Sequence, residues 1–225
     1  SQSYLDVEAV IAACKATGAQ AVHPGYGFLS ENTAFARRLE AEGIVFIGPT
    51  PENIEAFGLK HTARELALAN GVPLLPGSGL LADRDAAFAA AETVGYPVML
   101  KSTAGGGGIG MSLCADRASL EAAWEGVQRT ANASFGDARV YLERFVSNAR
   151  HVEVQIFGDG KGRVVALGER DCSLQRRNQK LVEEAPAPFL SDAQRERIHT
   201  AARDICAAAG YVSAGTVEFL LSQSG

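Results

Sequence analysis

The sequence predicts an α/β unit followed by an α+β unit, and three observations support this order. Up to residue 50, short apolar runs alternate with amphipathic helical segments, which is typical of a parallel sheet. A segment rich in proline and glycine, "VPLLPGSG" at 72–79, then interrupts this alternation. Beyond it the chain reads as a small module of helices and strands and a glycine-rich hairpin. With 225 residues, 47% of them hydrophobic, the chain can form a substantial core.

The first unit is expected to contain helices and strands in alternation. Residues 5–17 are predicted to be helical because apolar residues recur on one face and Gly18 follows. The other predicted elements are a strand at 19–25, a helix at 32–43, a buried strand at 44–49, and helices near 51–57 and 60–70.

The second unit is expected to begin as a module of two helices against a few strands. Its predicted elements are a helix at 83–94, a strand at 96–102, a strand at 109–114, a helix at 117–131 and a strand at 138–146. A hairpin over 151–172 follows, with a glycine-rich turn, and a long helix begins at Ser191, where Gln194 completes a capping box. A strand at 214–221 is the last element.

Composition excludes several classes of protein. The net charge of −5 argues against a non-specific nucleic-acid binder. No apolar run approaches the roughly 18 residues of a membrane-spanning helix, and no signal-peptide pattern is present. The cysteines are widely spaced, which argues against a zinc site or a disulfide framework and favours a cytoplasmic location. They are Cys14, Cys114, Cys172 and Cys206.

Four consecutive glycines, 105–108, lie between two predicted strands. The dinucleotide fingerprint requires a helix after the loop, and the P-loop requires Lys-Ser/Thr, but Met111 and Ser112 stand in a strand here. A glycine-rich strand–turn–strand can place backbone N–H groups against phosphates, with Lys101 supplying a positive charge. A flexible hairpin with a surface lysine is an equally good interpretation of the loop alone.

A charged segment and an acidic residue complete the candidate features. Residues 168–188 mix basic and acidic side chains, which is typical of a solvated surface, but apolar and proline-rich flanks favour a loop that carries a site. Glu218 lies in an otherwise apolar strand, where a carboxylate is costly unless it is paired or bound to a metal such as Mg²⁺. The sequence leaves both explanations of Glu218 open.

Together these residues resemble the biotin carboxylase family of ATP-grasp enzymes, over essentially the whole chain. The matching stretches are "HPGYGFLSEN" (23–32), "FIGP" (46–49), "KSTAGGGGIGM" (101–111), "HVEVQIFGDGKG" (151–162), "ERDCSLQRRNQKLVEEAPAP" (169–188) and "GTVEFL" (215–220). Within the family, the stretches 73–81 and 97–111 are most similar to urea carboxylase, and Ile109 stands where other members usually have Arg or Lys.

The resemblance implies a fold, a reaction and partners. The fold is an ATP-grasp fold preceded by part of a parallel-sheet, Rossmann-like N-terminal domain. ATP would phosphorylate bicarbonate to carboxyphosphate, which carboxylates biotin on a carrier domain. Implied cofactors and partners are ATP, Mg²⁺ or Mn²⁺, biotin, bicarbonate, a biotin carboxyl carrier domain and a carboxyltransferase domain, with a homodimer as one assembly of the full-length enzyme. Nucleic acid and membrane are not implied.

The resemblance also assigns roles to individual residues. Lys60 and Lys101 would contact the ATP phosphates, and Gly105, Gly106, Gly107 and Gly108 would form a lid over them. Lys180 would be the catalytic residue that binds bicarbonate or its phosphorylated form, and Glu218 would bind the metal ion. The adenine would be held by Glu143, Arg144, Phe145 and Val146, and the nucleotide pocket would be lined by His151, Gln175 and Asn178. Asn178 stands where many members have His.

The expected domain organisation follows the family. Residues 1–58 would be the C-terminal part of the N-terminal domain, 59–76 a linker helix, 77–146 the lid subdomain and 147–225 the first part of the core subdomain. Family residues beyond this core strand are absent, so we expect the 225 residues alone to be inactive. Two other interpretations remain: a carbamoyl-phosphate synthetase-like ligase that activates bicarbonate, and a non-catalytic nucleotide-binding module.

Overall fold

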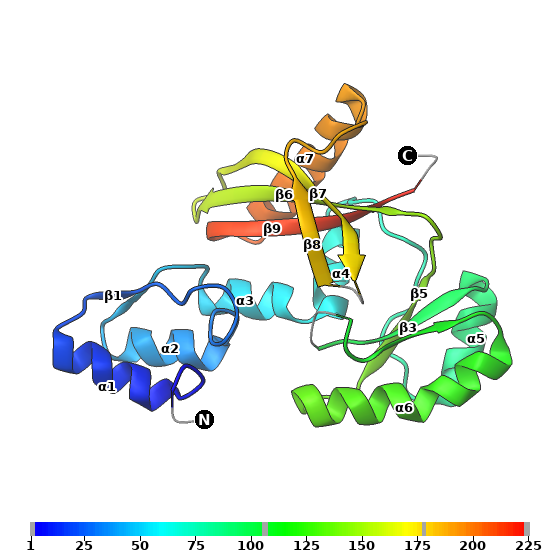
Figure 1. Ribbon diagram of the computed structural model, residues 1–225, viewed down its shortest axis with the longest axis horizontal. Helices are drawn as coiled ribbons and strands as arrows, with labels where there is room; N and C mark the ends of the chain where they lie inside the picture. Colours follow the sequence, from blue (N-terminus) through cyan, green and yellow to red (C-terminus); the bar gives the residue numbers. More distant parts are fainter. Residues whose placement is uncertain (1–2, 105–107, 177–178, 223–225) are drawn as a thin grey trace.

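The computed structural model describes residues 3–104, 108–176 and 179–222. Figure 1 shows three groups of elements: α1 to α3 with a small sheet, a module around α5 and α6, and a sheet of longer strands with α7. The fold combines α/β and α+β parts, as the sequence predicted. No helix in the described ranges is long and apolar enough to cross a membrane.

The first group is a parallel α/β unit. Its elements are α1 (Val7–Thr17), β1 (Ala21–Val22), α2 (Thr33–Ala41), β2 (Val45–Phe46) and α3 (Pro51–Gly58). β1 pairs with β2 in parallel, which confirms the parallel arrangement expected from the alternation. Asp6, Asn32 and Thr50 each cap a helix by accepting a bond from a backbone N–H, which sets where the helices begin. The apolar faces of α1 and α2 share a core that includes Ile11 and Phe35.

His23 shapes the turn after β1. Its Nδ1 accepts a 3.0 Å bond from the N–H of Gly25, and Gly25 has a φ of 72° that favours glycine. The loop therefore depends on this local bond, and His23 has a structural role in it.

The second group is the predicted module of two helices against three strands. Its elements are α5 (Arg84–Val94), β3 (Val98–Ser102), β4 (Met111–Cys114), α6 (Arg117–Phe135) and β5 (Val140–Arg144). The antiparallel sheet has the order β4-β3-β5, so β3, which ends next to the glycine loop, is central. Trp124 is 6% exposed and packs in the core of this module.

The third group is an antiparallel sheet covered by one helix. Its elements are β6 (Arg150–Asp159), β7 (Val164–Arg176), β8 (Gln179–Glu184), α7 (Asp192–Ala208) and β9 (Val212–Leu221), in the sheet order β8-β7-β6-β9. Ser191 and Gln194 form the predicted capping box of α7. Val152, Val154 and Ile156 alternate along β6 and pack under α7, so the intervening side chains project from the opposite face.

The prediction that the charged segment 168–188 forms a loop is wrong for most of its length. Residues up to Arg176 continue β7, and 179–184 form β8. The backbone ladder between β7 and β8 stabilises these strands, and Arg170 Nε lies 3.8 Å from Glu183 Oε2 across the pair. Such pairing does not require an apolar period in the sequence. Cys172, in the middle of β7, is fully buried, and burial raises its pKa to about 11, which agrees with a packing role.

α4 (Lys60–Ala69) connects the groups. Ala67, on the inner face of α4, packs in the core of the third group, and Val72 follows in the same core. At the other end of α4, the N–H of Lys60 donates to Thr103 O, at the end of β3, over 3.0 Å. α4 therefore contacts both the module that carries the glycine loop and the large sheet, as its central place in Figure 1 also shows.

Candidate functional site

Four charged side chains from four neighbouring strands gather on the face of the large sheet opposite α7. Glu153 on β6 lies directly across from Arg170 on β7 and from Glu218 on β9. Lys180 on β8 is the partner of Gln175 on β7. The register of the sheet thus brings together residues that are far apart in sequence.

Lys180 lies between two carboxylates. Its Nζ forms an ion pair with Glu153 and lies 3.1 Å from Glu218 Oε1. The other oxygen of Glu153, Oε1, accepts from Arg170 Nε at 2.7 Å and lies 2.5 Å from Arg170 Nη2. The Glu153 side chain is only 4% exposed, so two cations neutralise a buried carboxylate.

These contacts shift the pKa values of both partners. Burial favours protonated Glu153, but the bonds from Lys180 and Arg170 outweigh it and hold its pKa below the usual value. Burial acts to lower the pKa of Lys180, but Glu153 and Glu218 raise it overall. Lys180 is therefore a stable cation at neutral pH, suited to holding an anion and unsuited to accepting a proton as a base.

Glu218 has a second basic neighbour. His151 Nε2 lies 3.4 Å from Glu218 Oε1, and Gln175 Nε2 donates to His151 Nδ1 over 2.7 Å, which leaves His151 Nε2 to carry the proton toward Glu218. The bond from His151, with help from Lys180, lowers the pKa of Glu218 to about 2. Its side chain is 55% exposed, so this ionised carboxylate remains open to a further ligand.

A second cluster lies where the glycine-loop module meets α4. Lys101 Nζ on β3 forms an ion pair with Glu143 Oε2 on β5, its neighbouring strand. The other oxygen of Glu143 accepts from Arg64 Nη1 on α4 over 2.5 Å. All three side chains are more than four-fifths buried.

Lys60 adds a further positive charge to this region. Burial and the nearby charge of Lys101 lower its pKa, while Glu143 and Glu218 act in the opposite direction. Because Lys60 is influenced by residues of both clusters, it connects them electrostatically. An anion bound here would relieve the repulsion between the two lysines.

The stretch predicted to hold the adenine crosses from β5 toward the large sheet. The N–H of Arg144 donates to Pro76 O at 2.8 Å, and the N–H of Phe145 donates to Pro97 O at 3.0 Å. The side chain of Arg144 donates to Val94 O, at the end of α5, at 2.9 Å. Two backbone donors of the stretch are thus already engaged, as are the side chains of Glu143 and Arg144.

Four predicted site residues, Gly105, Gly106, Gly107 and Asn178, lie outside the described residues. Gly108 belongs to the turn before β4 and has a φ of 79°, a conformation that favours glycine. The structure brings Lys180, Glu218, His151 and Gln175 together, and Lys60 with Lys101 and Glu143.

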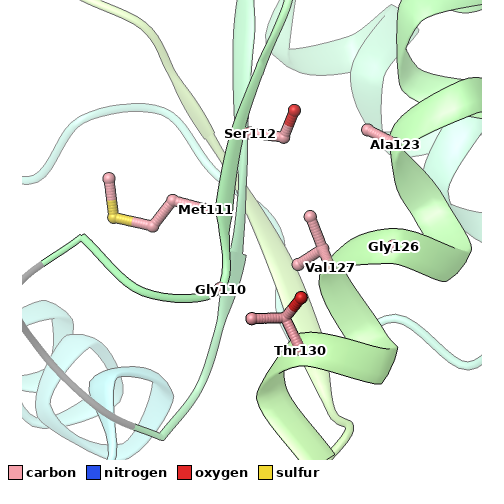
Figure 2. Close-up of a pocket in the computed structure, with 7 residues that line it drawn as sticks. All are labelled: Gly110, Met111, Ser112, Ala123, Gly126, Val127 and Thr130. Carbon is pink, nitrogen blue, oxygen red and sulfur yellow. The ribbon is translucent and has the colours of Figure 1, made fainter. Parts of the chain in front are cut away.

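A groove of about 290 Å³ lies on another face of the module, between β4 and α6. Figure 2 shows Ser112, Val127 and Thr130 between the strand and the helix, with Met111 turned away from α6. None of the residues that line this groove has an ionisable side chain, so the groove differs in chemistry from the charged clusters around Lys180 and Lys101. Its residues are Gly110, Met111, Ser112, Ala123, Gly126, Val127 and Thr130.

Sequence reasoning did not single out Glu153, Arg170 or Arg64 as site residues. Glu153 has the same signal as Glu218, an acidic residue in an alternating apolar strand, and could have been found in that way. Arg170 was visible only as one of several charges in the segment 168–188. Arg64 lies in an ordinary helical pattern and pairs with Glu143, 79 positions away, so nothing local marks it.

Comparison with known proteins identifies the family. Residues 60–225 match the family model "Carbamoyl-phosphate synthase L chain, ATP binding domain", and residues 1–54 match "Biotin carboxylase, N-terminal domain". The chain belongs to the biotin carboxylase family. The ATP-binding model alone carries the name of a different enzyme, and the match over residues 1–54 is what favours biotin carboxylase.

Relatives of this biotin carboxylase family member include several kinds of enzyme. The chain is 53% identical over 223 residues to urea amidolyase of Lachancea kluyveri, covering 99% of the chain and 12% of the relative. It is 49% identical over 224 residues to biotin carboxylase 2 of Bacillus subtilis, covering 99% of the chain and 50% of the relative. The chain thus spans half or less of these relatives.

A solved structure confirms the ATP-grasp fold of biotin carboxylases. The biotin carboxylase–β,γ-ATP complex from Campylobacter jejuni is 45% identical, with a TM-score of 0.97 over 100% of this chain and 50% of that chain. A 2-oxoglutarate carboxylase biotin carboxylase domain dimer from Hydrogenobacter thermophilus has a TM-score of 0.95 at 45% identity, over 99% of this chain and 49% of that one.

Proposed function

We propose that this chain is part of a biotin carboxylase that carboxylates carrier-bound biotin with ATP and bicarbonate, in an enzyme of the urea carboxylase type. The observation that carries the proposal is Lys180 held between Glu153 and Glu218 on one sheet face, in a chain of this family. The urea amidolyase relatives support the finer assignment, and the similar identity to biotin carboxylase 2 supports the general one.

In the first step, a bicarbonate oxygen attacks the γ-phosphorus of ATP, forming carboxyphosphate and releasing ADP. This chemistry requires positioning and neutralisation of charge more than covalent participation by the protein. Lys60 and Lys101 would bind the phosphates, with Gly105–Gly108 as the lid. Lys180 would hold bicarbonate by charge and hydrogen bonds, because its raised pKa keeps it protonated.

In the second step, the carboxyl group passes from carboxyphosphate to N1′ of biotin: the C–O bond to phosphate breaks, a C–N bond forms, and the N1′ proton leaves with the phosphate. Carboxyphosphate would be lost if water reached it, which gives a reason for a lid that closes. His151 and Gln175 would line the nucleotide pocket beside Glu218, and Asn178 is proposed there from the motif. The Glu143–Val146 stretch would border the adenine through backbone groups, because the side chains of Glu143 and Arg144 have other partners.

The donors present fit a magnesium ion. Glu218 is ionised and half exposed, and a carboxylate oxygen is a ligand that Mg²⁺ prefers. When bound, the ion would neutralise phosphate charge during transfer. Two structural neighbours, one a complex with β,γ-ATP and one a complex with MgADP and bicarbonate, support the same ligands here.

The relatives also suggest the setting of the reaction. We infer a biotin carboxyl carrier domain and a carboxyltransferase domain as partners, and the dimeric neighbour supports a homodimer of the full-length enzyme. A cytoplasmic location suits the pool of ATP and bicarbonate that the reaction needs. We refer to the enzyme that contains these 225 residues with the rest of its chain as the complete enzyme.

Lys180→Gln in the complete enzyme tests the proposal. We expect carboxylation of free biotin to fall at least about 100-fold, since a charge-assisted contact to the anion is lost, while ATP binding stays within about threefold. Lys161→Gln, at the exposed turn after β6, is the matched control and should retain activity. Wild-type ADP release that is independent of biotin would favour a carbamoyl-phosphate synthetase-like ligase. A wild type that binds ATP without turnover would favour a non-catalytic module.

The carboxyl acceptor requires a separate assay. ADP release by the complete enzyme should increase with urea and not with acetyl-CoA, propionyl-CoA or pyruvate. An increase with one of the other acceptors would contradict the urea assignment and leave the biotin carboxylase assignment intact.

A further inference from the structure

Arg64 connects α4 to the module that carries the glycine loop. Its Nη1 donates to Glu143 Oε1 on β5 over 2.5 Å, and its Nη2 donates to Leu75 O, in the linker, over 3.0 Å. Only 17% of the Arg64 side chain and 11% of the Glu143 side chain are exposed. Arg64 is therefore part of a buried ion pair between two parts of the fold.

The carboxylate of Glu143 is shared between Arg64 and Lys101. Arg64 binds Oε1 and Lys101 binds Oε2, so each cation has its own oxygen. Lys101 is also the lysine that the proposed function assigns to the ATP phosphates. Without Arg64, Lys101 would be the sole partner of this buried carboxylate and could not leave it for the nucleotide, because an unpaired buried charge is costly.

The charge around this cluster favours an incoming anion. Arg64, Lys101 and Lys60 are three cations in a region where Glu143 is the carboxylate in direct contact with two of them. If Lys101 turns toward a phosphate, Glu143 keeps Arg64 as its partner. The buried carboxylate of Glu143 then still has the Arg64 guanidinium as its cation.

We propose that Arg64 is a positioning residue that neutralises Glu143 and so frees Lys101 to bind the phosphates of the nucleotide. This inference rests on the proposed function, because it takes Lys101 as a phosphate ligand. It adds Arg64, a residue of α4 outside the stretches that resemble the family, as a determinant of how strongly the phosphates are held.

The geometry favours arginine at this position. A planar guanidinium donates in two directions at once, here to a carboxylate and to a carbonyl, whereas the lysine ammonium is a point charge on a flexible stem. Gly77 provides the space, because a Cβ at this position would lie 2.6 Å from Arg64 Nη2. Lysine at position 64 should therefore restore the charge without the fixed orientation.

The test compares MgATP with adenosine, a nucleoside that has no phosphate. In Arg64→Met, Lys101 must stay with Glu143, so we expect the Kd of the complete enzyme for MgATP to rise about tenfold, the effect of one charge-assisted bond. The Kd for adenosine should not change, because adenosine has no phosphate. Arg64→Lys should recover part of the affinity for MgATP. Arg84→Met, which removes a partly exposed arginine of α5 that pairs with Glu125 away from this cluster, is the matched control.

A second variant separates positioning from a purely structural role. In Arg64→Met/Glu143→Gln, the carboxylate that holds Lys101 is gone, so the affinity for MgATP should return to within about threefold of wild type. Equal losses for MgATP and adenosine, an unchanged Kd for MgATP in Arg64→Met, or no recovery in the double variant would overturn the inference. If Arg64→Met does not fold, Arg64→Lys and the double variant carry the same comparison. A wild type that binds no MgATP would refute the proposed function itself, and the inference with it.

Discussion

The ion pair between β7 and α7 offers a prediction that can be worked out from the structure. Glu169 is 2% exposed, and its carboxylate accepts from Arg195 Nε at 2.8 Å and lies 2.7 Å from His199 Nε2. Arg195 also donates to Ala187 O over 3.3 Å, in the segment that follows β8. Arg195→Met keeps most of the apolar stem and removes the charge.

The expected cost follows from the burial of Glu169. Removing one partner of a buried ion pair typically costs about 3–5 kcal/mol, because the remaining charge is left without compensation. His199 stays beside the second oxygen, and methionine preserves packing, so the lower end of the range applies. We expect the free energy of unfolding to fall by about 3 kcal/mol.

Urea unfolding of the purified protein, followed by circular dichroism, measures this change. The midpoint should fall and the slope m should stay constant, because the native fold is unchanged. Arg163→Met is the matched control: its side chain is 90% exposed and pairs with Asp159 in the hairpin turn, so little or no change is expected. A loss for Arg195→Met no larger than that of the control would refute the reasoning.

Two further predictions concern pH and the linker. The pKa of Glu169 lies below its usual 4.5 in the folded protein, so this carboxylate stabilises the fold above that value, and the contribution is lost as the pH falls through the lower folded pKa. The difference between wild type and Arg195→Met should therefore shrink in urea unfolding below pH 4.5, and a difference that stays constant would contradict this. Gly77→Ala places a Cβ 2.7 Å from Leu142 O and should cost about 1–3 kcal/mol in the same assay, whereas Gly79→Ala, with no atom within 4 Å, should be neutral. Equal stability of these two variants would argue against a close approach at Gly77.

Much of the local structure was predictable because its signals are local. The capping box at Ser191 specifies where α7 begins, and the spacing of Leu120, Trp124 and Val127 specifies which face of α6 is buried. Strands β7 and β8 were predicted poorly around 168–188. Their stability comes from pairing across strands, which does not leave an apolar period in either segment.

In the candidate site, too, some residues could be indicated by local motifs, and others could not. The motifs put Lys101, Lys180 and Glu218 forward as candidates, because of the family that these stretches resemble. They did not identify the counterions of these residues. Glu153 on β6 neutralises Lys180 on β8, two strands away in the sheet, and Arg64 reaches Glu143 on β5 from α4.

The sequence by itself therefore determined most elements outside 168–188, the family and a set of candidate residues for the chemistry. Propensity, caps and motifs act over a few positions, and all of them can be recognised along the chain. Only the tertiary structure decided which charges are partners, which carboxylates are buried and which cations remain available for a ligand. Electrostatic energy depends on distance and burial in space, and the ion pairs that join α4 to β5 and β8 to β6 are set by the packing of distant segments.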